Sequence, residues 1–286
     1  MPIQIEDVSY IYLEGTPFQQ MALNDVSLTI SDAQIVGIMG KTGSGKSTLL
    51  QLLNGLLRPT SGRVLIDGMD TRALNKKDLI KLRQKVGLVM QNPEQQIFEI
   101  TVFEEVGFGP KNADLDYAEI EQRVEEALLR VGLSYEDFKS RPTNSLSSGE
   151  KRRVAIAGIL ALGPEYLLLD EPSAGLDLDG KVGLLHYLTY LNKQKGTTIV
   201  LVSHDLDYLL EICHKIIILH EGKIWAELDG EDGKTDWLEI EKLGFSLPDY
   251  LKLAYMLKGK HWLKGIISKS RQQIIQQVVE SVNSRL

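Results

Sequence analysis

The sequence has 286 residues, of which 43% are hydrophobic and 25% charged, and its formal net charge is −7. A chain of this length and composition can bury a full core and can hold one large domain with a smaller appendage. The acidic balance argues against nucleic acid as the main partner, because phosphate backbones are bound by basic surfaces. The single cysteine, Cys213, excludes an internal disulfide, and its neighbours in residues 211–216 predict a small buried side chain.

The N-terminal segment predicts antiparallel strands. Residues 3–6 and 26–30 alternate apolar and polar side chains, the pattern of a sheet with one exposed face. Residues 10–17 lie between them and predict a turn rich in aromatic side chains. Tyr12 in this turn is either an aromatic residue packed on the core or a ring that stacks on a purine.

The next segment has the spacing of a phosphate-binding loop. Its residues are Gly40, Lys41, Thr42, Gly43, Ser44, Gly45, Lys46, Ser47 and Thr48. An apolar run precedes the loop and another follows it, which predicts a strand, a glycine turn and a helix. The glycines let backbone N–H groups close around phosphate oxygens, and the helix directs the positive end of its dipole at the same anion. We expect Lys46 to contact the β- and γ-phosphates of a nucleotide and the Ser47 hydroxyl to bind Mg²⁺.

The middle and end of the chain predict a parallel sheet. Residues 62–68 predict a short strand closed by a turn, and residues 76–83 a charged surface helix. Four apolar runs then occupy residues 86–90, 166–169, 198–202 and 216–219. Continuous apolar character indicates strands buried on both faces, and the helical patterns between them are typical of βαβ units. The expected class is α/β.

Polar side chains follow these runs where each predicted strand ends. Gln91 follows the first run, Asp170 and Glu171 the second, and His204 the third. Each of them alone would be read as a turn residue. Because open α/β sheets bind ligands at the carboxyl ends of their strands, their joint occurrence with the phosphate loop predicts that they converge on one nucleotide.

Each of these side chains has a chemical role in that interpretation. Asp170 fits a direct or second-sphere partner of Mg²⁺, and Glu171 can orient an attacking water or accept its proton. His204 can donate a hydrogen bond to the γ-phosphate or polarise the water. Gln91 can contact the γ-phosphate and so couple its presence to the position of the segment that follows. The predicted reaction is hydrolysis of the β–γ phosphoanhydride, driven by positioning and charge stabilisation.

A second anion site is predicted further along the chain. Residues 119–131 predict an amphipathic helix, and residues 146–150 open another helix that continues to about residue 160. Ser147 and Glu150 have the spacing of a capping box, which explains them structurally in any case. Gly149 beside Ser147 and Ser148 at a helix N-terminus also suits an anion. Two such sites in one chain are expected if these serines close over the nucleotide of a partner chain.

Taken together, the motifs resemble the ATP-binding cassette ATPases over residues 1 to about 229. The matching segments are the Walker A loop at 40–48, the Q-loop at Gln91, the signature at 146–150, the Walker B strand ending in Asp170 and Glu171, the D-loop at 173–177 with Ser173 and Asp177, and the switch residue His204. The signature departs from the family pattern with Ser148 in place of glycine and Glu150 in place of glutamine. Because Ser148 keeps its backbone N–H, contact with the γ-phosphate is expected to persist.

This resemblance implies the fold, the cofactors and several roles. The fold would be that of a P-loop NTPase with a RecA-like parallel-sheet core, an antiparallel β subdomain and a helical subdomain at about residues 92–160. ATP and Mg²⁺ would be the cofactors, with Tyr12 stacked on adenine and Gln91 joining Ser47 and Asp170 around the metal.

A closer resemblance is to the ATPases of energy-coupling factor transporters of the cobalt and vitamin type. It is carried by residues 92–98, 108–112 and 151–158, while residues 10–23 resemble the second of two paired ATPase subunits. The resemblance implies a homodimer or heterodimer of cassettes on the cytoplasmic side of the cell membrane. The dimer would bind a transmembrane energy-coupling T-component, a separate S-component would capture the solute, and ATP would power uptake of vitamins or metal ions.

Two alternatives belong to other classes: the ATPase of a different importer, and an ABC protein that acts on nucleic acid or ribosomes. The latter usually carries two cassettes or a long insertion between Walker A and the signature, and the 100 positions from Lys46 to Leu146 leave no room for one. No apolar run approaches the roughly 18 residues of a membrane span. We therefore expect a cytosolic chain that reaches the membrane by docking on another protein.

The last 57 residues, 230–286, are expected to form a small C-terminal domain. Residues 230–234 read as a linker. Ile274, Ile275, Val278, Val279 and Val282 are expected to form one apolar stripe of a terminal helix. The stripe either packs against its own domain or, as the family resemblance implies, belongs to a domain that helps to hold two ATPases together.

Overall fold

The computed structural model describes residues 2–174, 176, 178–229, 237–260, 263 and 271–283. The strands are β1 (Ile3–Tyr12), β2 (Gln20–Ile30), β3 (Ile35–Gly40), β4 (Ser61–Ile66), β5 (Met69–Asp70), β6 (Val86–Val89), β7 (Tyr166–Asp170), β8 (Thr198–Val202), β9 (Lys215–His220) and β10 (Lys223–Asp229). The helices are α1 (Lys46–Leu53), α2 (Lys76–Lys85), α3 (Val102–Asn112), α4 (Tyr117–Arg130), α5 (Tyr135–Phe138), α6 (Ser148–Ala161), α7 (Leu178–Lys195), α8 (Leu206–Ile212), α9 (Trp237–Lys242), α10 (Asp249–Gly259) and α11 (Arg271–Asn283), with two 3-10 helices, η1 (Pro93–Gln96) and η2 (Thr143–Ser145).

The N-terminal strands form an antiparallel sheet in the order β2-β1-β4-β5, as the alternating pattern predicts. The predicted turn over residues 10–17 is wrong at its start, because β1 continues to Tyr12 and the turn begins at Leu13. Pairing of Ile11 with Met21 and of Tyr12 with Gln20 extends the strand. Tyr12 is therefore a strand residue whose side-chain direction is set by the sheet.

The central sheet has the order β10-β9-β3-β8-β7-β6, and its strands are parallel except for β10, which runs antiparallel to β9. The four apolar runs and the strand before the phosphate loop are all parallel members of this sheet, as predicted. Strand β10 is an addition that the sequence analysis did not anticipate. It closes a hairpin through Glu221 and Gly222, which both have positive φ, the conformation of a two-residue hairpin turn.

Alternate residues of the parallel strands face two different cores. In β3, Val36 and Ile38 pack with α1 and the antiparallel sheet, whereas Ile35 and Met39 belong to the cluster with the helical residues of the other face. Cys213 is buried in that second cluster, as predicted. Burial on both faces explains why these strands read as continuous apolar runs.

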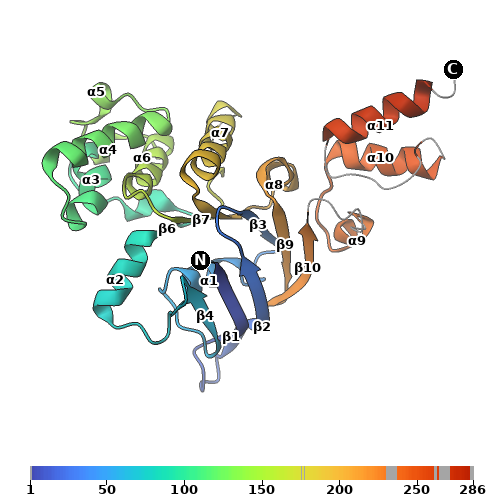
Figure 1. The fold of residues 1–286 in the computed structure, drawn as a ribbon, viewed down its shortest axis with the longest axis horizontal. Helices are drawn as coiled ribbons and strands as arrows, with labels where there is room; N and C mark the ends of the chain where they lie inside the picture. The colour runs from blue at the N-terminus through green and yellow to red at the C-terminus, as the bar shows by residue number, and fades with distance from the viewer. Residues whose placement is uncertain are drawn as a thin grey trace.

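Helices α3 to α6 form a group beside the β6 edge, and the C-terminal helices lie at the opposite side of the central sheet (Figure 1). The residues of the predicted apolar stripe lie on α11 but differ in burial: Ile274 is 2% exposed and Val278 packs on the core, whereas Ile275 and Val279 are 52% and 51% exposed. Among the described elements, α11 packs mainly on α10. The predicted linker at 230–234 and the side chain of Val282 lie outside the described part of the chain.

Among the described residues, no helix combines the length and the apolar character needed to cross a lipid bilayer.

Candidate functional site

The loop between β3 and α1 turns at positions that only glycine can occupy. A Cβ on Gly40 would lie 2.3 Å from Ser44 Oγ and 2.5 Å from the carbonyl oxygen of Leu219. Gly45, the N-cap of α1, has a φ of 102°, and its Cβ would lie 2.5 Å from the carbonyl oxygen of Ala22. The loop therefore presents backbone N–H groups at the N-terminus of α1, where an anion is favoured.

Lys46 supplies a buried positive charge to this loop. Its Nζ donates hydrogen bonds to the carbonyl oxygens of Gly40 at 2.7 Å and Lys41 at 3.0 Å. Burial lowers the pKa of the ammonium, and the nearby carboxylates Glu171 and Asp170 act in the opposite direction. A cation beside a ring of N–H donors suits a phosphate group.

The next residue of α1 connects the loop to the end of β7. Ser47 Oγ donates a hydrogen bond of 2.6 Å to Asp170 Oδ2, although the two residues are 123 positions apart in the chain. Both are hard oxygen donors of the kind that Mg²⁺ prefers, and Mg²⁺ in phosphate sites needs just one or two protein oxygens beside phosphate and water. The pair fits that ion. The described residues contain no group of three or more His, Cys, Asp and Glu side chains that could hold a metal without such help.

Glu171 has the electrostatics of a general base. Burial, with the adjacent Asp170 as a second cause, raises the pKa of its carboxyl to about 7. The pKa of His204 is lowered by burial and by Lys46, so its imidazole is mostly neutral near pH 7. His204 Nε2 lies 3.1 Å from Glu171 Oε1, although no donor among the described residues is aligned for a hydrogen bond with that oxygen. A carboxylate poised near pH 7 can accept a proton from a water molecule.

These groups share one cavity of about 200 Å³. Its lining consists of Tyr12, Gln20, Ala22, Thr42, Gly43, Gly45, Lys46, Ser47, Thr48, Gln91, Asp170, Glu171 and His204. Gln91 is exposed at the start of the segment after β6. The structure thus brings together the predicted strand-end residues and the phosphate loop at the carboxyl ends of β3, β6, β7 and β8.

One wall of the cavity comes from the antiparallel sheet. Tyr12 is 37% exposed, and its hydroxyl lies 3.1 Å from Thr48 Oγ1, within hydrogen-bond distance. Gln20 and Ala22 line the cavity as well, and the sequence analysis missed both. Gln20 pairs with Tyr12 across the hairpin, so it shares a sheet face with the tyrosine. The register of the hairpin could have identified it, but that register was hidden by the long connection between the strands.

The signature residues are elsewhere. Ser147, Ser148 and Gly149 are exposed at the N-terminus of α6, and none of them lines the cavity that holds Lys46. The predicted capping box is present, with Ser147 accepting from Glu150 N–H and Glu150 accepting from Ser147 N–H.

The departure at Glu150 has a structural explanation. Glu150 also pairs with Arg141 at 2.9 Å. The Ser147 N–H and Arg141 together lower the pKa of Glu150 to about 2, so it is ionised at neutral pH.

The D-loop follows Glu171 directly. Ser173 is buried in this turn, where its carbonyl oxygen accepts from Leu176 N–H at 3.2 Å. Asp177, the other predicted D-loop residue, lies outside the described residues.

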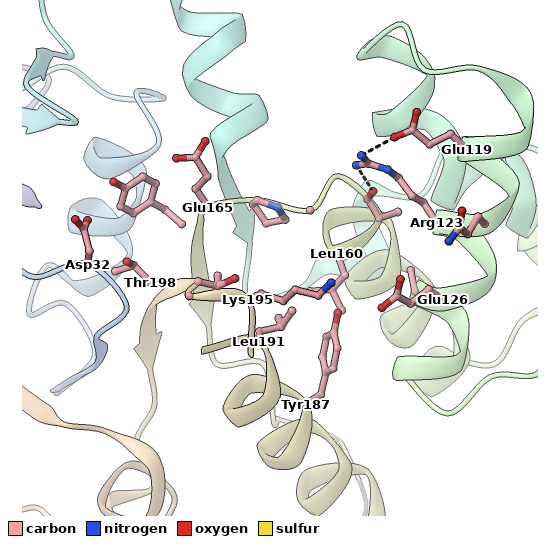
Figure 2. A pocket seen from close by; sticks show the side chains of 18 residues that line it. Asp32, Glu119, Arg123, Glu126, Leu160, Glu165, Tyr187, Leu191, Lys195 and Thr198 are labelled. Atoms are coloured by element: carbon pink, nitrogen blue, oxygen red, sulfur yellow. Dashed lines mark hydrogen bonds and ion pairs between the residues drawn. The ribbon is translucent and has the colours of Figure 1, made fainter. Parts of the chain in front are cut away.

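A larger cavity, of about 630 Å³, lies at the amino ends of β7 and β8, between α4, α6 and α7 (Figure 2). Several of its charged side chains form ion pairs: Arg123 contacts Glu119 at 2.9 Å, and Glu165 is 3.4 Å from Lys85, which lies outside the lining. No predicted site residue lines it. The predicted strand-end residues and the phosphate loop line the smaller cavity instead.

Comparisons with known proteins agree with this geometry. Residues 23–174 match the ABC transporter family. The protein named Energy-coupling factor transporter ATP-binding protein EcfA2 in Symbiobacterium thermophilum is 48% identical over 262 residues, which cover 92% of this chain and 90% of that protein. The protein of the same name in Streptococcus agalactiae is 44% identical over 287 residues, 99% of each chain.

Two solved structures are also similar. A dimeric ATP-binding cassette in a post-hydrolysis state, bound to ADP and Pi, has a TM-score of 0.74 at 33% identity and covers 79% of this chain and 98% of its own. The structure of cbiO1 from Clostridium perfringens, described as part of the ABC transporter complex cbiONQ, has a TM-score of 0.71 at 37% identity and covers 88% and 97%. The chain therefore has the ABC ATPase fold and belongs to the ATP-hydrolysing ABC transporter family, within its group of energy-coupling factor transporter ATP-binding proteins.

Proposed function

We propose that this chain is the motor subunit of an energy-coupling factor importer, which hydrolyses ATP with Mg²⁺ to drive uptake of a vitamin or a metal ion. The observation that carries the proposal is the convergence of Lys46, the hydrogen-bonded pair Ser47 and Asp170, and the close pair Glu171 and His204 on one cavity. This set contains a phosphate-binding cation, oxygen ligands for the metal and a base.

Binding comes from the loop and its surroundings. The backbone N–H groups of residues 40–48 and Lys46 hold the phosphates, and Tyr12 stacks on the adenine ring. Ser47 and Asp170 hold Mg²⁺, with Gln91 as a third ligand from the segment after β6. Bound there, the ion supplies positive charge that stabilises the triphosphate oxygens during phosphoryl transfer.

Hydrolysis uses Glu171 and His204. The Glu171 carboxylate takes a proton from water as the water oxygen bonds to the γ-phosphorus, and the bond from that phosphorus to the β–γ bridging oxygen breaks. The products are ADP and inorganic phosphate. Neutral His204, beside Glu171 Oε1, orients the water or donates to the γ-phosphate.

The site would be completed by a second cassette. Ser147 to Gly149 are exposed, and they present N–H groups at a helix N-terminus away from their own loop. In a dimer of two cassettes these groups would contact the γ-phosphate bound to the partner, and Ser173 and Asp177 would lie near the dimer contact. The partner is a second copy or a related ATPase.

An exposed apolar patch supports docking to a membrane protein. Phe98, Ile100 and Phe108 are 63%, 75% and 40% exposed, and the rings of Phe98 and Phe108 pack edge to face at 4.8 Å. The patch lies just beyond Gln91 in the chain. A coupling helix of the T-component that binds this patch would therefore move with the segment after Gln91. The chain would then work on the cytoplasmic face of the cell membrane, and the S-component would select the solute.

Reconstitution tests the proposal. The chain is co-expressed with its candidate membrane partners, and the purified complex is placed in vesicles with ATP and Mg²⁺ on the side of the ATPase. We expect solute uptake with ATP and none with a non-hydrolysable ATP analogue. A chain that purifies with ribosomes and is stimulated by RNA, and not by the membrane partners, would contradict it.

A further inference from the structure

Arg152 is a buried cation that none of the motif roles accounts for. It is 8% exposed and lies near the start of α6, the helix whose N-terminus carries the signature residues. Its Nη2 donates a hydrogen bond of 2.6 Å to the main-chain carbonyl oxygen of Glu171. The side chain thus reaches from the helical group to the end of β7.

The main chain of Glu171 has an unusual conformation. Its φ is 51°, in the left-handed region that residues other than glycine rarely adopt. The Glu171 N–H donates to Val202 at 3.1 Å, and the Glu171 carbonyl accepts from Ala174 N–H at 3.2 Å as well as from Arg152. The orientation of this peptide determines where the carboxylate points, and Arg152 supplies the charged hydrogen bond that holds it.

Glu94 connects Arg152 to the segment after Gln91. The helix η1, which contains Glu94, packs against α6. Burial lowers the pKa of Arg152, and the carboxylates of Glu94 and Glu171 favour its charged form. Glu94 Oε2 and Arg152 Nε are both buried without a hydrogen-bond partner among the described residues, so each retains unused bonding capacity.

We propose that Arg152 is a positioning residue for ATP hydrolysis, which fixes the main chain of Glu171 and links it through Glu94 to the segment that follows Gln91. The inference rests on the proposed role of Glu171 as the base. Arg152 would then couple two features of the chain. One is the position of α6, whose N-terminus carries the signature residues toward a partner's nucleotide, and the other is the orientation of the base in the chain's own site.

The test is steady-state ATPase kinetics of the full-length chain in its transporter complex. Arg152→Met removes the donor and the charge at similar length, and we expect kcat to fall about 10- to 100-fold while KM for ATP changes less than about threefold. Arg152→Lys should restore part of kcat, because an ammonium can donate to the same carbonyl. Glu94→Gln should lower kcat less, and adding it to Arg152→Met should cause no further loss.

Arg123 of α4 offers a matched control, because it contacts main-chain carbonyls at the far end of α6. It donates to the carbonyl oxygens of Ala161 and Leu162 at 3.4 and 3.1 Å and pairs with Glu119, beside the cavity of Figure 2. Arg123→Met removes the same kind of contact between a guanidinium and main-chain carbonyls, so it should leave kcat near the wild-type value.

Wild-type kcat in Arg152→Met, or equal losses in Arg152→Met and Arg123→Met, would overturn the inference. Full additivity of the Glu94 and Arg152 effects would overturn the link through Glu94. If Glu171→Gln turned over ATP normally, the proposed function itself would fail. If Glu171→Gln were inactive and Arg152→Met normal, only the present inference would fail.

Discussion

Both ends of the central sheet carry charged groups, but the two ends hold these groups differently. At the carboxyl ends, Lys46 and Glu171 are buried with displaced pKa values, and Glu171 Oε1 has no aligned donor among the described residues. At the amino ends, Arg123 and Glu119 form an ion pair, and Asp67 accepts hydrogen bonds from Tyr166 and Lys85. The larger cavity lies at the end of the sheet where these pairs form.

The difference agrees with the proposal that the catalytic site lies at the carboxyl ends of the strands. Buried charges without matched partners cost stability, so they persist where a ligand will contact them. Paired charges at a subdomain junction stabilise the fold without requiring a ligand. Changes at the carboxyl ends should therefore alter catalysis, and changes at the amino ends should alter stability alone.

The largest effect is expected from Lys46→Ala. Removing the buried ammonium takes away the cation that we propose contacts the β- and γ-phosphates, so ATP hydrolysis should fall by roughly a hundredfold or more, with weakened nucleotide binding. ATPase assays and fluorescence titration with a labelled nucleotide measure both. Lys195→Ala, at an exposed residue lining the opposite cavity, is the control and should bind ATP normally.

The pH dependence of kcat gives the next effect. The base must be ionised, and with a pKa of about 7 its ionised fraction rises about tenfold from pH 6 to pH 8. We expect kcat to rise over that interval in single-turnover measurements. A flat profile with chemistry rate-limiting would contradict the role of Glu171.

A substitution at the amino ends of the strands should change the free energy of unfolding. Tyr166→Phe removes a hydrogen bond to the Asp67 carboxylate, which should lower the free energy of unfolding by about 1–2 kcal/mol. Burial would raise the pKa of Asp67, but Tyr166 and Lys85 lower it below its usual value. Its stabilisation is thus present at neutral pH and lost as pH falls through the folded-state pKa. Chemical denaturation at pH 7 measures the change, and kcat should remain unchanged.

The smallest effect is expected from Glu119→Gln. The ion pair with Arg123 joins residues one turn apart on α4 and is partly exposed. Such pairs contribute about 0.3–0.5 kcal/mol to the free energy of unfolding. A shift in the denaturation midpoint within that range, with normal ATP turnover, would agree. A large loss of activity would show that the amino-end cavity takes part in function.

Local patterns in the sequence predict which residues meet at the strand ends, because each motif lies beside its own strand. The glycine spacing of residues 40–48 and the apolar runs before Gln91, Asp170 and His204 are readable without knowing how the chain folds. Parallel pairing then brings the strand ends together, which is a general property of α/β sheets.

Contacts that depend on packing between distant segments could not be predicted. The contact of Arg152 with the Glu171 carbonyl requires α6 to dock on the end of β7, and no periodicity encodes that. The stripe of α11 shows the same limit, because Ile274 and Ile275 have similar hydrophobicity and differ only in which one faces a neighbour. Strand β10 was not predicted although Glu221 and Gly222 give a hairpin signal, because an edge strand lacks the long continuous apolar run of the buried strands.

ATP turnover by Glu171→Gln, with nucleotide binding measured in the same preparation, tests the central claim most directly. We predict that this variant binds ATP with near-normal affinity, loses hydrolysis by a factor of about a hundred or more and accumulates as an ATP-bound closed dimer. Without nucleotide at pH 8, the variant should also unfold at a higher temperature than the wild-type protein. The raised pKa of Glu171 means that its carboxylate, once ionised above pH 7, destabilises the folded state, and the variant lacks this charge. Turnover at the wild-type rate would contradict the assignment of the base and the account of the site built on it.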